Sequence, residues 1–362
     1  MTGDLKDFYS GKKVLVTGHT GFKGSWLSLW LLELGCKVGG YALSSDTEPN
    51  LYGILGLSDK VTEVIADIRD REKAKSFVKE FSPDIVIHMA AQPLVRRSYK
   101  DPALTYETNV MGTVNLLEAC REAPSVRSIV NVTSDKCYDN HGEDRPYSET
   151  DPMGGHDPYS SSKGCSELVS SAYSRSYFSE QQYGATHKTA LATARSGNVI
   201  GGGDWSEDRL IPDAIRAFLK HEPLVVRYPD AVRPWQYVLE PLYGYLLLAR
   251  NLYEKGRDFS GPWNFGPDEK EAKPVSWIAE HTANIWGNGA KWQISDGEKP
   301  HEARNLKLNS EKACTLLGWH STIDLEESVE KTMRWYDVWQ KGGDIYRYSL
   351  REIDLYRQRI NI

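Results

Sequence analysis

Two residues four positions apart are spaced to act together as an acid–base site. Tyr159 and Lys163 open the run Tyr-Ser-Ser-Ser-Lys-Gly-Cys-Ser-Glu-Leu-Val, which has a helical pattern. A spacing of four places both side chains on one helical face. An ammonium beside a phenol favours the phenolate, so we expect Lys163 to lower a tyrosine pKa that is ordinarily about 10 and to make Tyr159 a base near neutral pH. Alone the spacing is a weak signal, because tyrosine and lysine often fall four residues apart.

A glycine-rich turn near the start of the chain strengthens this hypothesis. Gly18, Gly21 and Gly24 give the pattern Gly-x-x-Gly-x-x-Gly between an apolar run at 13–17 and a helical pattern at 22–34. Small residues in such a turn let backbone N–H groups and the helix N-terminus approach a pyrophosphate. The turn therefore predicts a dinucleotide cofactor, and together with the tyrosine–lysine pair it indicates hydride transfer.

A polar run, Thr133-Ser134-Asp135, lies between the turn and the tyrosine. It follows an apolar run at 128–133, and open parallel sheets bind ligands at the carboxyl ends of their strands. We therefore expect Asp135 and the next residue, Lys136, to take part in chemistry. Alternatively, these two charged side chains are simply solvated at the end of a strand and take no part in chemistry.

Short apolar runs alternate with helical patterns along the first half of the chain. The predicted strands are 13–17, 36–43, 61–65, 84–88, 128–133 and 190–195, and the predicted helices are 22–34, 70–81, 103–122 and 158–178. Strand–helix alternation with continuous apolar strands predicts an α/β fold of the doubly wound, Rossmann type, with a parallel sheet covered on both faces.

The pattern changes after Arg195, where Gly-Gly-Gly-Asp-Trp and loops rich in Pro and Trp follow. We place a domain boundary there. The chain is then predicted to form a dinucleotide-binding domain from 1–195 plus about 235–262. A smaller, discontinuous domain that binds the substrate would take 196–234 plus about 263–362.

Composition excludes several classes of partner. The formal net charge is −6 and the basic residues form no long run, so we expect no nucleic acid. The five cysteines lack metal-binding or C-x-x-C spacing, which indicates no metal and a reducing compartment. The longest apolar run, 26–32, is too short to span a bilayer, and residues 1–12 lack an apolar signal core. We therefore expect a cytoplasmic protein that does not bind membranes.

Motifs in a fixed order resemble those of the extended short-chain dehydrogenases/reductases that act on sugar nucleotides. They are Thr17-Gly-x-x-Gly-Phe-x-Gly24, Asp67-Ile68, His88-Met-Ala-Ala91, Asn109-Val-Met-Gly-Thr113, Thr133-Ser134, Tyr159-x-x-x-Lys163, Arg195-Ser-Gly-Asn-Val199, Arg233-Pro-Trp-Gln-Tyr-Val238 and Trp263-Asn-Phe-Gly266. Within this family, the runs 133–138 and 201–212 most closely resemble the branch of 4,6-dehydratases that act on CDP-glucose. The preference for cytidine comes from this resemblance and not from any spacing.

The resemblance implies a redox-neutral cycle with NAD that yields a 4-keto-6-deoxy sugar nucleotide for deoxysugar biosynthesis. Tyr159 would take the proton of the sugar C4 hydroxyl, Lys163 would hold the nicotinamide ribose, and Thr133 would bind O4. The transient ketone acidifies C5–H, so that an unactivated C6 hydroxyl can leave with a proton from Asp135. The hydride then returns to C6 as C5 is reprotonated. Thymidine-linked relatives carry an acidic pair where this chain has Asp135-Lys136. We expect Lys136 either to stabilise an enolate or to take the C5 proton.

The same resemblance assigns the binding residues. Cofactor contacts are expected at Gly18, Thr20, Gly21, Phe22, Lys23, Gly24, Asp67, Ile68, Ala90, Ala91, Gln92, Asn109, Tyr159 and Lys163. Substrate contacts are expected at Ser134, Asn198, Arg209, Leu210, Arg227, Arg233 and Arg304. A guanidinium fork fits phosphate oxygens, so Arg233 and Arg304 are candidates for the diphosphate, although either could form a surface ion pair. Strand two ends without a ribose carboxylate or a basic partner for a 2′-phosphate, so this position leaves NAD versus NADP open.

Two other kinds of function are compatible with parts of this pattern. A dehydratase or 4-epimerase of another sugar nucleotide needs the same tyrosine, lysine and cofactor, but an epimerase has no use for Asp135. A non-catalytic NAD-binding sensor or scaffold would need neither Tyr159 nor Lys163. The resemblance also implies a homodimer through a bundle of the helices at 103–122 and 158–178, whereas a monomer could bury their apolar faces internally.

Overall fold

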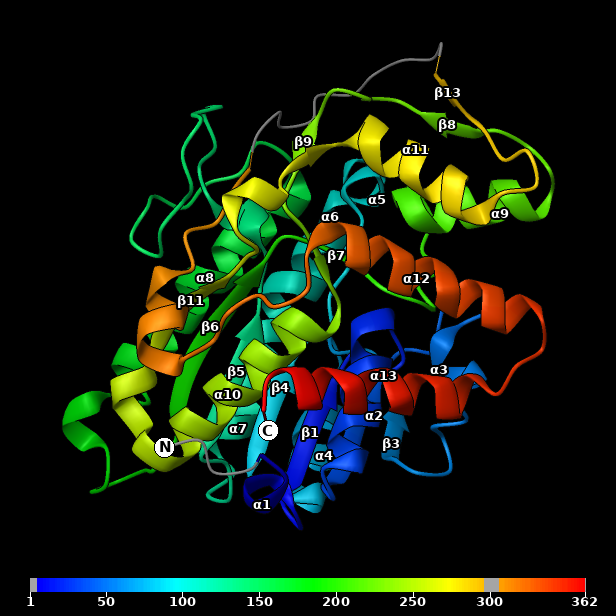
Figure 1. Ribbon diagram of the computed structural model, residues 1–362. Coiled ribbons are helices and arrows are strands. Elements are labelled where there is room, and N and C mark those ends of the chain that lie inside the picture. The colour runs from blue at the N-terminus through cyan, green and yellow to red at the C-terminus, as the bar shows by residue number, and fades with distance from the viewer. Residues whose placement is uncertain (1–4, 296–305, 362) are drawn as a thin grey trace.

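The computed structural model describes residues 5–295 and 306–361. Its centre is a seven-stranded sheet with strand order β11-β6-β5-β4-β1-β2-β3, in which every neighbouring pair is parallel (Figure 1). The strands are β1 (Lys13–Thr17), β2 (Lys37–Ala42), β3 (Thr62–Ile65), β4 (Ile85–His88), β5 (Ser128–Val132), β6 (Ala190–Ser196) and β11 (Gly261–Phe265). The predicted α/β class with a parallel sheet is confirmed.

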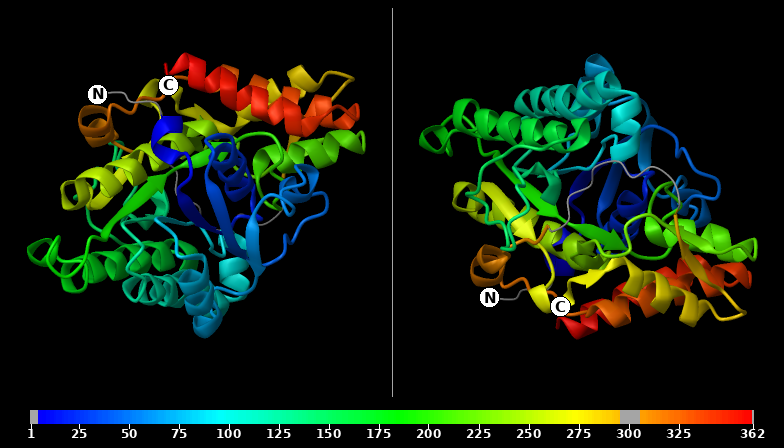
Figure 2. Two further views of the ribbon diagram at one scale, coloured as in Figure 1. Left: turned by 90° about the horizontal axis from the view of Figure 1, so that it is seen from below. Right: turned by 90° about the horizontal axis from the view of Figure 1, so that it is seen from above.

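Helices cover both faces of this sheet (Figure 2). One face carries α2 (Phe22–Glu33) and α10 (Leu239–Lys255), and the other carries α4 (Arg71–Phe81), α7 (Gly112–Arg121) and α8 (Pro158–Ser176). Successive strand side chains point to opposite faces. Val14 and Val16 of β1 accordingly pack in the core that contains α2 and α10, while Leu15 packs in the core that contains α4 and α7. This explains why the strands read as continuous apolar runs.

The helix predicted at 103–122 is interrupted. It consists of α6 (Pro102–Tyr106), a π-helical turn at Glu107–Met111, and α7. Within the turn, the Asn109 side chain leaves the helix to meet Gln92: Gln92 N donates to Asn109 Oδ1 at 2.8 Å, and Asn109 Nδ2 donates to Gln92 O at 3.1 Å. Single π turns often lie at functional sites. An apolar repeat does not reveal such a one-residue insertion.

A second group of elements lies above the sheet in Figure 1. It includes β7 (Asn198–Ile200) paired with β10 (Trp235–Tyr237), β8 (Leu224–Val226) paired with β13 (Trp292–Ile294), β9 (Val232–Arg233) paired with β12 (Lys273–Pro274), α9 (Leu210–Leu219) and α11 (Val275–Trp286). Between these segments the chain returns to the sheet through α10 and β11, which extends the sheet to Phe265. The domain boundaries given above remain predictions.

The remaining helices are α1 (Leu5–Tyr9), α3 (Leu51–Ile54), α5 (Val95–Lys100), α12 (Leu325–Gln340) and α13 (Ile345–Arg359). The pair α12 and α13 closes the molecule beside α11 and α2. Among the described residues, none of the helices combines the length and the apolar character needed to cross a bilayer.

Candidate active site

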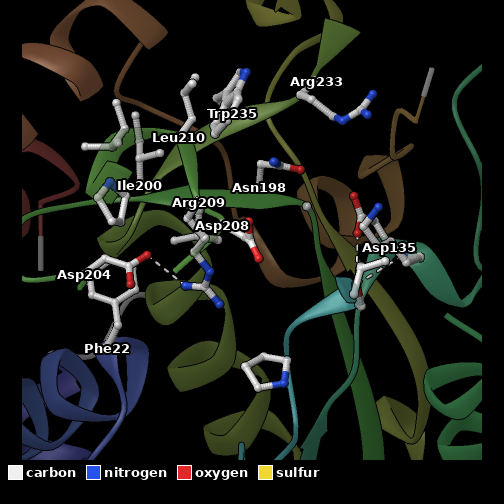
Figure 3. A pocket seen from close by; sticks show the side chains of 18 of the residues that line it. Phe22, Asp135, Asn198, Ile200, Asp204, Asp208, Arg209, Leu210, Arg233 and Trp235 are labelled. Carbon is white, nitrogen blue, oxygen red and sulfur yellow. Dashed lines mark hydrogen bonds and ion pairs between the residues drawn. The ribbon is translucent and has the colours of Figure 1, made fainter. Parts of the chain in front are cut away.

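A cavity of about 320 Å³ lies at the carboxyl ends of the central strands (Figure 3). It is bounded by the start of α2, the segments after β4 and β5, the start of α8, and the elements above the sheet. All the predicted catalytic residues line it: Thr133, Asp135, Lys136, Tyr159 and Lys163. Residues spread over thirty positions of sequence therefore converge on one space, as expected for the edge of a parallel sheet.

The glycine-rich turn fits a dinucleotide. Gly18 has φ +74°, and a Cβ there would lie 2.8 Å from Ala90 N. A Cβ on Gly24 would lie 2.1 Å from Gly18 O, so both positions need glycine to close the turn. Gly21 caps α2, and no side chain supplies a cap hydrogen bond. An uncapped helix N-terminus beside a residue without a Cβ is a suitable place for a pyrophosphate.

The other cofactor candidates surround this turn. Phe22, Lys23 and Ala91 line the cavity together with Tyr159 and Lys163. The rest lie in the turn after β1, in the first turn of α2, after β3, after β4 or in the π-helical turn: Gly18, Thr20, Gly21, Gly24, Asp67, Ile68, Ala90, Gln92 and Asn109. They lie along the edge where the resemblance places a dinucleotide.

Two lysines share this edge with one arginine. Burial, followed by the positive charges of Lys163 and Arg209, lowers the pKa of Lys23 to about 7. Burial likewise lowers the pKa of Lys163 to about 8, against the opposing effect of Glu167. Cations held this close together favour a negatively charged ligand or a phenolate nearby.

The predicted effect of Lys163 on Tyr159 is wrong for this structure. Burial raises the pKa of Tyr159 to about 12, and a hydrogen bond with Ser134 offsets only part of that rise. Lys163 Nζ donates instead to Val132 O at 3.3 Å. The sequence spacing gives the shared helical face correctly, but it does not show that desolvation of the phenol exceeds the effect of the neighbouring charge.

Two adjacent hydroxyls have different partners in this structure. The Thr133 hydroxyl, which the resemblance assigns to the sugar O4, donates to Glu167 Oε1 on α8. Glu167 also accepts two bonds from Arg195, each of 2.9 Å. Ser134 is the hydroxyl that meets Tyr159, and it also donates to Asp135 Oδ1 at 3.0 Å. Thr133 therefore belongs to a buried network and Ser134 lies at the phenol, while the contact of Thr133 with the sugar O4 stays a prediction.

Asp135 is only 3% exposed, and its Oδ2 has no hydrogen-bond partner within the described parts of the chain. Burial raises the pKa of this carboxyl. A Cβ at Gly197 would lie 3.1 Å from Oδ2, so glycine leaves the carboxyl room. A buried carboxyl with an unsatisfied oxygen is costly unless it serves a ligand, and a raised pKa suits a proton donor.

The predicted substrate residues lie around the same cavity. Ser134, Asn198, Arg209, Leu210, Arg227 and Arg233 line it, whereas Arg304 falls outside the described residues. Arg209 pairs with Asp204 at 2.8 Å. Arg227 pairs with Asp208 at 3.2 Å, and this aspartate also binds Arg96 at 2.7 Å.

Four acidic residues of this region were missed from the sequence. Asp204, Asp208 and Asp213 line the cavity, and Glu167 organises the network behind it. The first three recur at intervals of four and five residues in the run Gly-Gly-Gly-Asp-Trp-Ser-Glu-Asp-Arg-Leu-Ile-Pro-Asp. Glu167 follows Lys163 by four residues, and this continues the face begun by Tyr159. Both spacings can be read from the sequence and could have indicated these residues.

Comparison with known proteins supports this picture. Residues 14–260 match the model of the NAD dependent epimerase/dehydratase family. The CDP-glucose 4,6-dehydratase of Salmonella typhimurium is 51% identical over 97% of this chain and 98% of its own length. A dTDP-glucose 4,6-dehydratase of Xanthomonas campestris is 29% identical over 94% of this chain and 98% of its own.

Solved structures show the same fold. The UDP-glucose 4-epimerase of Thermus thermophilus in complex with NAD has a TM-score of 0.76 at 26% identity, covering 89% of this chain and 98% of its own. The dTDP-glucose 4,6-dehydratase of Bacillus anthracis in complex with NAD has a TM-score of 0.74 at 23% identity, covering 94% of this chain and all of its own. The predicted resemblance and the predicted cofactor, NAD, are confirmed. The chain belongs to the NAD dependent epimerase/dehydratase family.

Proposed function

We propose that the protein converts CDP-D-glucose to CDP-4-keto-6-deoxy-D-glucose by NAD-dependent intramolecular dehydration. The observation that carries this proposal is the 51% identity, over nearly the whole of both chains, to a CDP-glucose 4,6-dehydratase. The buried acid Asp135 beside Tyr159 supports it, because an epimerase has no leaving hydroxyl to protonate.

The first half of the reaction is oxidation at C4. NAD, when bound, supplies a hydride acceptor and donor and a positive charge that favours a phenolate. Tyr159 takes the proton of the C4 hydroxyl, and Ser134 binds the oxygen that loses it. With a pKa of about 12, Tyr159 is protonated near neutral pH in this structure, so the phenolate depends on positive charge such as that of Arg209.

The second half is loss of water across C5–C6, followed by return of the hydride taken from C4 to C6 and of a proton to C5. The C4 ketone makes C5–H acidic, and Lys136 acts at that carbon. Asp135 gives its proton to the departing C6 hydroxyl, which a carboxyl with a raised pKa and an unpartnered oxygen is suited to do. General acid catalysis of this kind typically contributes about 10²–10⁴-fold.

The substrate's diphosphate is proposed to lie among Arg209, Arg227 and Arg233. Arg233 is buried, although it carries a charge, and all three line the cavity. Guanidinium groups match phosphate oxygens with two parallel bonds, which suits a diphosphate better than a single lysine would.

A homodimer through α6, α7 and α8 is also proposed. Exposed apolar side chains gather on these helices and the turn between them: Tyr106 is 36% exposed, Met111 51% and Leu168 61%. Apolar side chains on neighbouring helices mark an interaction surface when they form a contiguous patch. Leu168→Lys should shift the protein to a monomer in sedimentation analysis, and an unchanged sedimentation coefficient would argue against this surface.

The decisive test uses purified protein with NAD+ and a panel of nucleoside diphosphoglucoses, with product mass as the readout. We expect CDP-glucose to lose the mass of one water molecule and the other nucleotides to react slowly. A product of unchanged mass and altered stereochemistry would identify an epimerase. Absence of turnover on every nucleotide, with NAD+ bound, would favour a sensor or scaffold.

A further inference from the structure

The cavity has two chemically different ends. Asp135 and Tyr159 stand at one end, where the sugar must react. In Figure 3, Leu210 lies on the opposite side from Asp135, with Asn198 between them. The cavity wall contributed by α9, β8 and α11 is apolar and contains Leu210, Leu224, Val226 and Val275.

This layout indicates where a nucleoside diphosphate sugar would place its base. With the sugar at Asp135 and the diphosphate among the arginines, the base is the part that remains for the apolar end. Flat apolar walls suit the faces of a planar ring. Discrimination between bases, however, requires a polar group aimed at the edge of that ring.

Asp213 is the carboxylate placed at this end. It lies in the first turn of α9, three residues after Leu210, and it lines the cavity. Its Oδ1 accepts a hydrogen bond from Arg216, and its side chain is 35% exposed. Within the described part of the chain, no hydrogen bond to Oδ2 is found, so that oxygen is available to a ligand.

The other two carboxylates that this segment adds to the cavity are more heavily engaged. Both oxygens of Asp204 accept bonds, one from Ser206 N at 3.1 Å and one from Arg209 at 2.8 Å. One oxygen of Asp208 accepts hydrogen bonds from two guanidinium groups, those of Arg96 and Arg227. Asp213 accepts a hydrogen bond through one oxygen from one arginine, Arg216, although the charge of Arg227 also acts on it, and it follows Leu210 of the apolar wall by three residues.

We propose that Asp213 reads the base, with Oδ2 accepting a hydrogen bond from the exocyclic amine of cytosine. The proposal rests on the proposed function and deepens it, because it names a residue that selects the nucleotide. A carboxylate accepts a hydrogen bond from the N4 amine of cytosine, whereas uracil and thymine present a carbonyl oxygen at the same place. Two acceptors cannot share a hydrogen bond, so the carboxylate rejects these bases.

The test measures binding rather than turnover. The affinities of CDP and UDP for the protein in the presence of NAD+ are compared by calorimetry for wild type, Asp213→Asn and Asp208→Asn. An amide can accept from cytosine or donate to uracil, so Asp213→Asn should narrow the CDP-to-UDP preference. One good base contact corresponds to about 5- to 150-fold in discrimination, which sets the expected change. Asp208→Asn, in the same cavity, should change both affinities by the same factor.

The ratio of the two affinities decides whether Asp213 reads the base. An unchanged CDP-to-UDP ratio in Asp213→Asn, or a changed ratio in Asp208→Asn alone, overturns the assignment to Asp213. Equal affinity of wild type for CDP and UDP overturns it together with the cytidine preference. Failure of wild type to bind either nucleotide overturns the proposed function itself. If circular dichroism shows that Asp213→Asn does not fold, Asp213→Ser replaces it, because the serine hydroxyl can also donate or accept a hydrogen bond.

Discussion

The hydroxyl of Thr133 donates a hydrogen bond to the carboxylate of Glu167, and this carboxylate holds a buried two-bond ion pair with Arg195. Glu167 follows Lys163 by four residues on α8, so a single helical face carries both. The contact joins the end of β5 to α8 and β6. It engages the Thr133 hydroxyl with Glu167, whereas the Ser134 hydroxyl is hydrogen-bonded to Tyr159.

This arrangement predicts opposite consequences for two adjacent hydroxyls. Ser134→Ala should lower kcat by about 10- to 150-fold, the value of a hydrogen bond to a charged group of about 1.5–3 kcal/mol. Thr133→Val removes one of the donors to the buried Glu167 carboxylate, which keeps its bonds from Thr193 and Arg195, so it should lower the free energy of unfolding by about 1–3 kcal/mol. Steady-state kinetics and urea denaturation of both variants measure the two effects. A larger loss of kcat in Thr133→Val than in Ser134→Ala would restore the role expected from the sequence.

Replacement of the phenol tests the acid–base assignment. Tyr159→Phe should lose about 10²–10⁴-fold in turnover while it binds NAD+ nearly as wild type does, because only a proton donor and acceptor is removed. Lys163→Met is the comparison, since removal of its buried ammonium should weaken both activity and cofactor binding. Product formation and NAD+ affinity, by calorimetry, are the measurements. Turnover near the wild-type rate in Tyr159→Phe would reject the tyrosine as the base.

The sequence predicted the sheet well because its signals are local. The first strand, Lys13–Thr17, matches residue for residue, because the apolar run ends at a glycine-rich turn that marks its boundary. The choice between Thr133 and Ser134 was not local. Neighbouring side chains at a strand end point in different directions, and which one faces α8 depends on how β5 packs in three dimensions.

The pKa values and ion pairs of the site are harder to predict from the sequence than the strands are. The spacing of Tyr159 and Lys163 correctly places both at the cavity, but a pKa depends on how much water surrounds each group. Burial raises the pKa of Tyr159, and no pattern in the sequence reports the degree of that burial. The ion pairs of Asp208 were equally hidden, because Arg96 lies 112 positions away in the chain.

Lys23 should make the stability of the protein depend on pH. Burial, Lys163 and Arg209 lower its pKa to about 7 in the folded state, whereas the unfolded value is about 10.4. Between these two values the unfolded chain binds more protons, so the contribution of Lys23 to stability rises with pH. The free-energy cost of burying Lys23 is therefore largest below pH 7 and disappears near pH 10.

Lys23→Met removes that cost. The variant should melt at a higher temperature than wild type at about pH 6, and the difference should shrink as the pH approaches about 10. Thermal unfolding without cofactor at several pH values measures this directly. Lys188→Met, at an exposed lysine, is the matched control and should show a difference that does not vary with pH. A gain for Lys23→Met that grows with pH would contradict the assigned direction of the shift.

Replacement of Asp135 should separate dehydration from oxidation. Asp135→Asn keeps the size of the side chain but loses the proton that the C6 hydroxyl needs. Oxidation at C4 should survive, because Tyr159 and Lys163 are untouched, while elimination should slow by about 10²–10⁴-fold. On mixing the variant with NAD+ and CDP-glucose, reduced-nicotinamide absorbance should persist, whereas wild type shows it only transiently.

Lys136→Met distinguishes the two groups that act in this step. If Lys136 takes the C5 proton, its loss should also block elimination, and the C5 hydrogen should no longer exchange with deuterium from solvent. Asp135→Asn should retain that exchange, because its defect follows removal of the proton. Elimination at the wild-type rate in Asp135→Asn would place the acid elsewhere. Asp135 has a buried oxygen without a hydrogen-bond partner among the residues that the structure describes, and it would then need another ligand to account for its position against Gly197.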